Sequence, residues 1–172
     1  MEPKPQTSKS YLSQLTLIHG AMLVTQIGFA LVAYFLYATG QIDPSGADDL
    51  AKIFQIIVPV FMVASFIGGS ILIRSQLKVL KSKNQLNDKL AGYRGLFLIK
   101  LALFEVPSLL SIICFLLTGK YLFLGLVALV LCLFVLQRPT SYGIVNELEL
   151  NSNERADFEN PNAIVSELRR PQ

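Results

Sequence analysis

The sequence predicts an all-α integral membrane protein, a four-helix bundle with both termini on the cytoplasmic side. Of its 172 residues, 52% are hydrophobic and only 16% are charged, and the mean hydropathy is +0.51. Soluble domains are less apolar and carry more charge. Four long apolar segments alternate with polar stretches, and the lysines and arginines gather in every second stretch. The lipid bilayer is therefore the expected surrounding of most of this chain.

The spans follow from length and composition. A helix needs about 20 mostly apolar residues to cross ~30 Å of hydrocarbon. Backbone groups in lipid must form hydrogen bonds within their own segment, so such spans are expected to be helical. The first segment is longer than the ~7 to 15 apolar residues of a cleavable signal peptide, so it is counted as a span. The four predicted spans are residues 12–37, 51–73, 95–118 and 121–137.

Orientation follows from the placement of lysine and arginine. Cations precede the first span, lie between the second and third, and follow the fourth, whereas the opposite side has only Lys52 and Lys120. The positive-inside rule then places both termini in the cytoplasm. We expect a cell inner (plasma) membrane location, with residues 1–11 and 138–172 cytoplasmic. The flanking cations are Lys4, Lys9, Arg138, Arg155, Arg169 and Arg170.

Residues 74–94 are predicted to form a basic cytoplasmic hairpin. Their composition favours helix, so the second and third helices are expected to extend beyond the bilayer and turn near residues 82–87. The cations either bind anionic lipid head groups or a partner, or only set the topology. They are Arg74, Lys78, Lys81, Lys83, Lys89 and Arg94.

The tail, residues 138–172, is too short to build a core of its own. We expect residues 151–160 to be polar and mobile and residues 161–170 to form one short helix. A docking segment or an interfacial tail fits this composition better than a domain.

Three ionisable residues lie within the predicted spans, where such groups are costly and often functional. Glu105 lies closest to the bilayer midplane, and Gln26 of the first span lies at nearly the same depth. His19 and Lys100 share a level nearer the cytoplasm. We therefore predict that Gln26 contacts Glu105 and that His19 faces Lys100.

The roles of these residues stay open between a functional and a structural interpretation. Glu105 is either a carboxylate that takes up H⁺ or a cation, or a neutral acid that hydrogen-bonds two helices together. Lys100 either extends toward the cytoplasmic head groups or has a catalytic role. His19 has no second ligand at metal-binding spacing, which favours a helix-contact role.

Proline and small residues predict local features of the second and third helices. Pro59 and Pro107 remove hydrogen bonds and are expected to bend them, while Ser108 and Ser111 can serve carbonyls freed nearby. Gly68, Gly69 and Ser70 would let another helix approach closely.

Two resemblances bear on function. The stretch Leu101-Ala-Leu-Phe-Glu-Val-Pro107 resembles the ion-carrying outer helix of the proteolipid ring subunit of rotary ATPases. The glycine-rich partner helix of that subunit is missing, so membership is rejected. With its Arg138-Pro139-Thr140 exit from the last span, the whole chain resembles the small four-span inner-membrane proteins common in bacteria, which implies a location without an activity.

Two functions compete. The first is a non-enzymatic accessory or assembly subunit that interacts with the lipid bilayer and with other membrane proteins or a second copy of itself. The alternative is a small proton- or cation-coupled transporter built on Glu105, with Gln26, His19 and Lys100 lining the path. We expect no catalytic residues, cofactor or metal site and no nucleic-acid partner, because no nucleophile with a base, phosphate loop or Cys/His ligand set is present.

Overall fold

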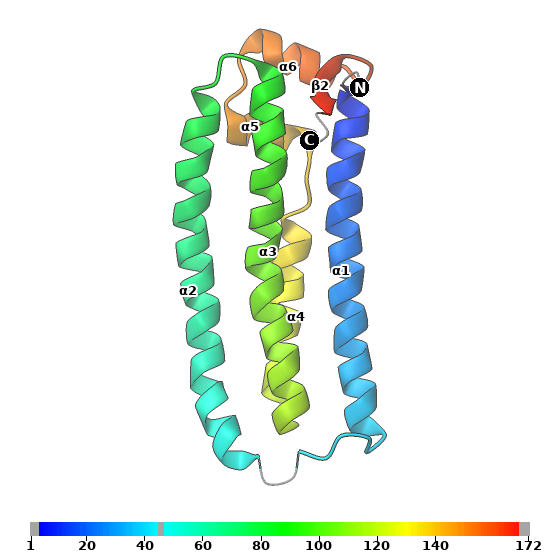
Figure 1. Cartoon of the computed structure of the whole chain (residues 1–172), viewed down its shortest axis with the longest axis vertical. Helices are drawn as coiled ribbons and strands as arrows, with labels where there is room; N and C mark the ends of the chain where they lie inside the picture. Colours follow the sequence, from blue (N-terminus) through cyan, green and yellow to red (C-terminus); the bar gives the residue numbers. More distant parts are fainter. Residues whose placement is uncertain (1–3, 45–46, 169–172) are drawn as a thin grey trace. The chain divides into compact units, whose positions relative to one another are not determined.

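The chain is helical along most of its length in a computed structural model that describes residues 4–44 and 47–168. The predicted flanking cations Arg169 and Arg170 lie outside the described residues. The four long helices are α1 (Ser8–Ala38), α2 (Asp48–Lys81), α3 (Leu86–Thr118) and α4 (Tyr121–Leu136) (Figure 1). The short elements are β1 (Lys4–Thr7), α5 (Ser141–Leu148), α6 (Ser152–Glu159) and β2 (Ile164–Leu168).

Three of these helices, α1, α2 and α3, are each long and apolar enough to cross a membrane, and the number becomes four if α4 and α5 are counted together as one bent span. The helices α2 and α3 extend well past the predicted spans. Helix α2 ends at Lys81 and α3 begins at Leu86, so the chain turns within the predicted 82–87 stretch. Pro59 and Pro107 lie inside α2 and α3 without ending either helix.

The described residues divide into two compact units, and α1, α2 and α3 each contribute residues to both. The terminal unit comprises the described residues of Met1–His19, Ile71–Lys100 and Arg138–Gln172. The span unit comprises those of Gly20–Ser70 and Leu101–Gln137.

In the terminal unit, the two ends of the chain pair with each other. Strand β1 runs antiparallel to β2, with Lys4 opposite Leu168 and Gln6 opposite Ser166. Figure 1 shows α6 and β2 beside the start of α1, where the Ser8 amide donates to the Ala163 carbonyl at 3.1 Å. The predicted short helix over 161–170 is therefore wrong. β-branched Ile164 and the buried, β-branched Val165 favour the strand.

The predicted mobile stretch 151–160 is also wrong, because it forms helix α6. Asn151 caps this helix: its side chain accepts from the amides of Asn153 and Glu154, and Glu154 accepts from the Asn151 amide. This reciprocal capping box stabilises a helix of low apolar content. Phe158 on α6 is 1% exposed and meets the Tyr11 ring edge-on, so the tail packs on the N-terminal part of α1.

In the span unit, all four long helices contribute to one buried apolar cluster. Its buried members are Ala33 of α1, Val58 of α2, Ile112, Cys114 and Phe115 of α3, and Phe123 and Val127 of α4. Gly69 lies against the Leu103 side chain, whereas a side chain at Gly68 would meet nothing within 4 Å, so the predicted close approach is confirmed at Gly69 and not at Gly68. Most other side chains of α2 face outward and are apolar.

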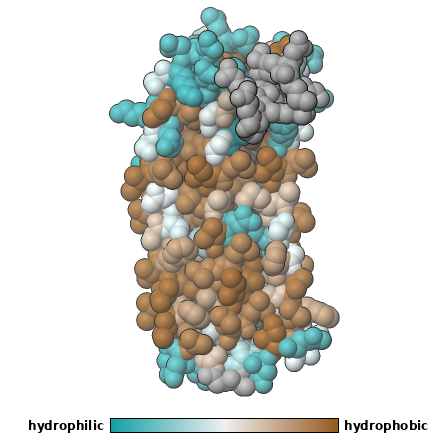
Figure 2. Space-filling model, viewed as in Figure 1, coloured by the Kyte–Doolittle hydropathy of each residue, from teal (hydrophilic) through white to brown (hydrophobic). Residues whose placement is uncertain are grey.

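The surface of the helices is apolar along much of its length. Hydrophobic side chains cover most of the helix surface seen in Figure 2, while hydrophilic ones gather near helix ends and in a small area amid the hydrophobic surface. Hydroxyl groups on the helices bond to their own backbone: Thr16 donates to the Leu12 carbonyl and Thr25 to the Ala21 carbonyl, both at 2.9 Å. Such bonds satisfy exposed hydroxyls on an otherwise apolar helix surface.

Candidate functional site

The carboxyl group of Glu105 is the most unusual polar feature of the span unit. It projects from the middle of α3 and is half-buried. Among residues 4–44 and 47–168, no side chain forms an ion pair or hydrogen bond with it. An acid at this position in a spanning helix is expensive unless something donates a hydrogen bond to it.

Gln26 of α1 does not supply that bond. Its side chain is 0% exposed, yet neither Nε2 nor Oε1 has a hydrogen-bond partner among the described residues. Gln26 and Glu105 therefore share no hydrogen bond, and their proximity stays a prediction. A buried amide normally satisfies at least part of its hydrogen-bonding capacity.

The two residues are predicted to share a level in the span unit. Ala33 of α1 and Ile112 of α3 belong to the same buried cluster, and the Tyr37 ring lies 5.3 Å from that of Phe115, centroid to centroid. Counting back seven residues from Ala33 and Ile112 reaches Gln26 and Glu105. Because helices rise ~1.5 Å per residue, this packing is compatible with the predicted agreement in depth, which stays a prediction.

A serine joins this level from the buried face of α3. Ser108 is 0% exposed and its hydroxyl has no partner among the described residues. Ser111, also fully buried, donates to the Pro107 carbonyl at 2.8 Å. Of the two serines predicted to serve freed carbonyls, only Ser111 therefore bonds one. Gln26, Glu105 and Ser108 together offer an amide, a carboxyl and a hydroxyl that can bind a small hydrogen-bonding ligand or a proton.

Lys100 and His19 belong to the terminal unit. The Lys100 ammonium lies 2.9 Å from Oε1 of Glu147 on α5, and the Tyr93 hydroxyl donates to Oε2 of the same carboxylate at 2.7 Å. The lysine therefore extends toward the tail rather than lying unpaired in a span. His19 is buried.

The predicted basic surface is smaller than expected. Lys89 is buried and pairs with Glu154 of α6 at 2.8 Å, so its assignment to that surface is wrong. Lys81 pairs with Glu149 at 2.7 Å, and Arg94 donates to Oε1 of Gln6 at 2.6 Å. Of the remaining cations, Arg74, Lys78 and Lys83 are exposed.

The three tail carboxylates, Glu147, Glu149 and Glu154, were missed by sequence reasoning. Each pairs with a lysine of the hairpin or of α3. The signal that could have found them is complementary charge, because an acidic stretch after the last span matches the basic stretch between the second and third. Burial opposes ionisation of Glu154, but hydrogen bonds from the Lys89 ammonium and the Asn151 amide and the lysine's charge hold its pKa below the ordinary value.

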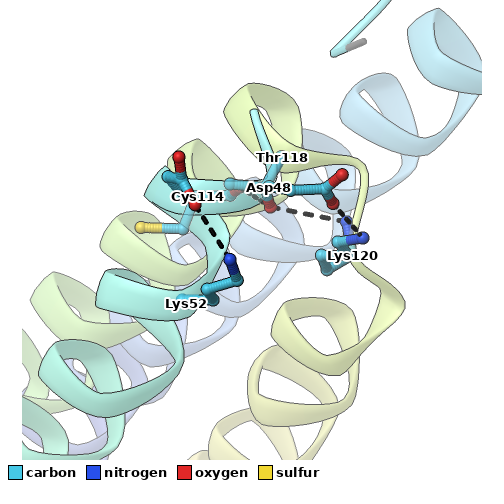
Figure 3. Close-up of polar contacts among 6 residues, drawn as sticks. Asp48, Lys52, Cys114, Thr118 and Lys120 are labelled. Carbon is cyan, nitrogen blue, oxygen red and sulfur yellow. Dashed lines mark hydrogen bonds and ion pairs between the residues drawn. The ribbon is translucent and has the colours of Figure 1, made fainter. Parts of the chain in front are cut away.

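A second set of polar side chains in the span unit lies at the connections between α1 and α2 and between α3 and α4. The Asp48 carboxylate lies 2.9 Å from the Lys120 ammonium, and the two side chains point toward each other in Figure 3. Lys52 pairs with Asp49 at 2.9 Å. Nearby, the Thr118 hydroxyl donates to the Cys114 carbonyl at 2.6 Å. Of these residues, Asp48, Thr118 and Lys120 border a pocket of about 540 Å³, which is also lined by Tyr37, Gly40, Ile42, Asp43 and Pro44. Sequence reasoning had used Lys52 and Lys120 only to set the orientation of the chain.

Comparison of the chain with protein-family models, curated proteins and solved structures finds no match.

Proposed function

We propose that this protein is a non-enzymatic, multi-pass protein of the cell inner (plasma) membrane, an accessory or assembly subunit that packs laterally against another membrane protein or a second copy of itself. The observation that carries this proposal is the half-buried Glu105 carboxyl, which has no partner among the described residues of its own chain.

The cost of that carboxyl explains the need for a neighbour. An acid near the centre of a spanning helix costs about 2.5 to 3.5 kcal/mol on insertion scales. A hydrogen bond from an adjacent helix offsets part of that cost. Beside Glu105 on α3, Ala102 and Val106 are exposed. The small alanine one turn away would let the backbone of a neighbouring helix come close.

The proposed topology has four crossings with both termini in the cytoplasm. The pairing of β1 with β2 supports it, because segments near the two ends of the chain lie together and only an even number of crossings allows this. The positive-inside rule then selects the cytoplasmic side. The fourth crossing would be α4, whose 16 residues cover about 24 Å at 1.5 Å per residue, so local thinning of the bilayer would accompany it.

The hydrogen bonds of three helix hydroxyls support a non-enzymatic role. Ser70, Ser111 and Thr118 each donate to a carbonyl four residues back in their own helix. A hydroxyl held in this way is not activated by a base, which nucleophilic catalysis requires.

Lateral assembly is tested by resonance energy transfer between donor- and acceptor-labelled copies in lipid vesicles, together with cross-linking in native membranes. We expect transfer or a defined cross-linked complex for the wild type, loss of at least half of that signal in Glu105→Leu, and retention in Glu105→Gln, whose amide still forms hydrogen bonds. Val106→Leu, a change at the neighbouring exposed position, is the matched control. A wild type that is monomeric in vesicles and forms no complex in native membranes would refute the proposal.

The buried, unpartnered side chains of Gln26 and Ser108 favour a second candidate, proton- or cation-coupled transport at Glu105. Polar groups at one level beside a protonatable acid are what an ion path requires. The test is dye-reported proton flux into proteoliposomes. Flux that persists unchanged in Glu105→Gln would rule this candidate out.

A further inference from the structure

Gln26 presents an unusual problem of hydrogen bonding. Its side chain is 0% exposed, and both its amide nitrogen and its amide oxygen are without a partner among the described residues. In an apolar interior such groups are costly unless something satisfies them. The occupant must both accept from Nε2 and donate to Oε1.

Ser108 of α3 presents the same problem at nearly the same level. It is 0% exposed, and its hydroxyl has no partner among residues 4–44 and 47–168. It lies seven residues before Phe115, two helical turns along the same face of α3, and the Phe115 ring packs against Tyr37 of α1. The Ser108 side chain is therefore on the same face of α3 as Phe115, whose ring packs against Tyr37 of α1, the helix that carries Gln26, and against Tyr121 of α4.

We propose that Gln26 and Ser108 form a binding site for water between α1 and α3, with the Glu105 carboxyl at its edge. Water donates and accepts, so one or two molecules can satisfy the amide, the hydroxyl and one carboxyl oxygen together. A bare cation fits less well, because it would coordinate the oxygens and leave the donor Nε2 unsatisfied.

The site lies wholly within the span unit and does not depend on lateral assembly or on transport. Glu105 is one turn from Ser108, in the i, i+3 relation that brings side chains together on a helix. A hydrated site would thus keep this carboxyl in contact with a proton donor and acceptor inside the apolar part of the protein. Ser111 is not part of the site, because its hydroxyl bonds the Pro107 carbonyl.

The test is solid-state NMR on the full chain in lipid bilayers, with glutamine side chains labelled with ¹⁵N. Magnetisation transfer from water to the Gln26 Nε2 group is measured, and the Gln26 signal is assigned by its loss in Gln26→Met. Gln85, which is exposed in the turn after α2, serves as a positive control for transfer. We expect transfer from water to the Gln26 Nε2 group in the wild type.

Two serine variants then test the site. Ser108→Ala removes one proposed ligand of the water, so transfer to Gln26 should fall about twofold or more. Ser111→Ala removes an equally buried hydroxyl that is bonded within its own helix, so transfer should stay as in the wild type. Absence of transfer to Gln26 while Gln85 shows it, or equal effects of the two serine variants, overturns the proposal. A Gln26 signal that shifts with sodium concentration but receives no transfer would indicate a bound cation and also overturn it.

Discussion

Lys89 and Glu154 show how burial changes the meaning of a charge. Their side chains are 8% and 10% exposed, and the ammonium nitrogen lies 2.8 Å from the carboxylate. Glu105, by contrast, has no charged partner among the described residues. The first pair ties the tail to the hairpin inside the terminal unit, whereas the lone acid needs a partner outside its own chain or a hydrated surrounding.

Replacing Lys89 should be strongly destabilising. Lys89→Met leaves the Glu154 carboxylate buried without its counter-ion, so we expect a loss of about 3 kcal/mol in the free energy of unfolding. The exposed pair Arg155–Glu159, with exposures of 52% and 48%, provides the control, and Arg155→Ala should cost less than about 0.5 kcal/mol. Denaturant titration in detergent micelles measures the loss for each variant, and hydrogen exchange of α6 provides a second measurement. Equal costs would show that the buried pair contributes no more than an exposed one.

The stability of the terminal unit should also depend on pH. The pKa of Glu154 is lowered in the folded protein, so its ionised form is favoured there over the unfolded chain. The stabilisation is present above the unfolded glutamate pKa of about 4.3 and is lost as pH falls through the lower folded value. Hydrogen exchange of α6 should therefore accelerate as pH is lowered through this acidic range, after correction for intrinsic rates. Glu154→Gln and Lys89→Met should both flatten that dependence, and an unchanged slope in either variant would contradict this account.

At the scale of elements, the turns decide how the helices end. Gly119 ends α3 with φ of +65°, and its amide donates to the Phe115 carbonyl at 2.7 Å. A side chain at this position would meet the Tyr37 ring and Pro44 at less than 3 Å. Gly40, after α1, has a similar φ of +71° but nothing within 4 Å. Substitutions at the two glycines therefore distinguish the cost of backbone strain, which both share, from the cost of steric overlap, which arises only at Gly119.

Alanine at these two glycines should cost different amounts. Gly40→Ala should lose only the left-handed preference, about 1 kcal/mol. Gly119→Ala adds the displacement of Tyr37 and Pro44, so we expect at least about 1 kcal/mol more. Reversible unfolding in mixed micelles gives both values. Equal losses would mean that the loop after α1 does not pack on the end of α3 as described.

The two tail elements show where local pattern misleads. The stretch that forms α6 has few apolar residues, and its helix depends on the Asn151 cap, the buried Phe158 and the Glu154 pair. Residues 164–168 have helix-compatible spacing, but they form a strand because β1 supplies its backbone partners. Neither β1 nor Lys89 is adjacent to the tail in sequence, so no local pattern contains them.

At the scale of the whole molecule, the pairing of β1 with β2 makes a prediction about topology. The Lys9 amide donates to the Pro161 carbonyl at 3.3 Å, so residues near Lys9 and Asn162 must lie on the same side of the membrane. In a chain carrying Cys114→Ala and Cys132→Ala, single cysteines are introduced as Lys9→Cys, Asn162→Cys or Gln41→Cys. A membrane-impermeant maleimide should label only Gln41→Cys in intact cells and all three after permeabilisation. Opposite labelling of Lys9→Cys and Asn162→Cys would contradict the strand pairing.

The sequence by itself determined the long apolar helices and the turn between Lys81 and Leu86. Each of these depends on composition, helix period or rise per residue, which are local quantities. Side-chain partners do not follow from such quantities. Lys100 bonds Glu147, and Gln26 bonds neither Glu105 nor any other described residue.

Only the tertiary structure decided that the tail folds onto the hairpin, that half of the predicted basic surface contacts other parts of the terminal unit, and that Ser108 is buried without a partner. These features join residues 65 or more positions apart, as Lys89 and Glu154 are, or depend on which face of a helix packs inward. The physical reason is that burial and pairing are set by surfaces that meet after the helices have formed. Composition and hydrophobic period, by contrast, are properties of each helix on its own.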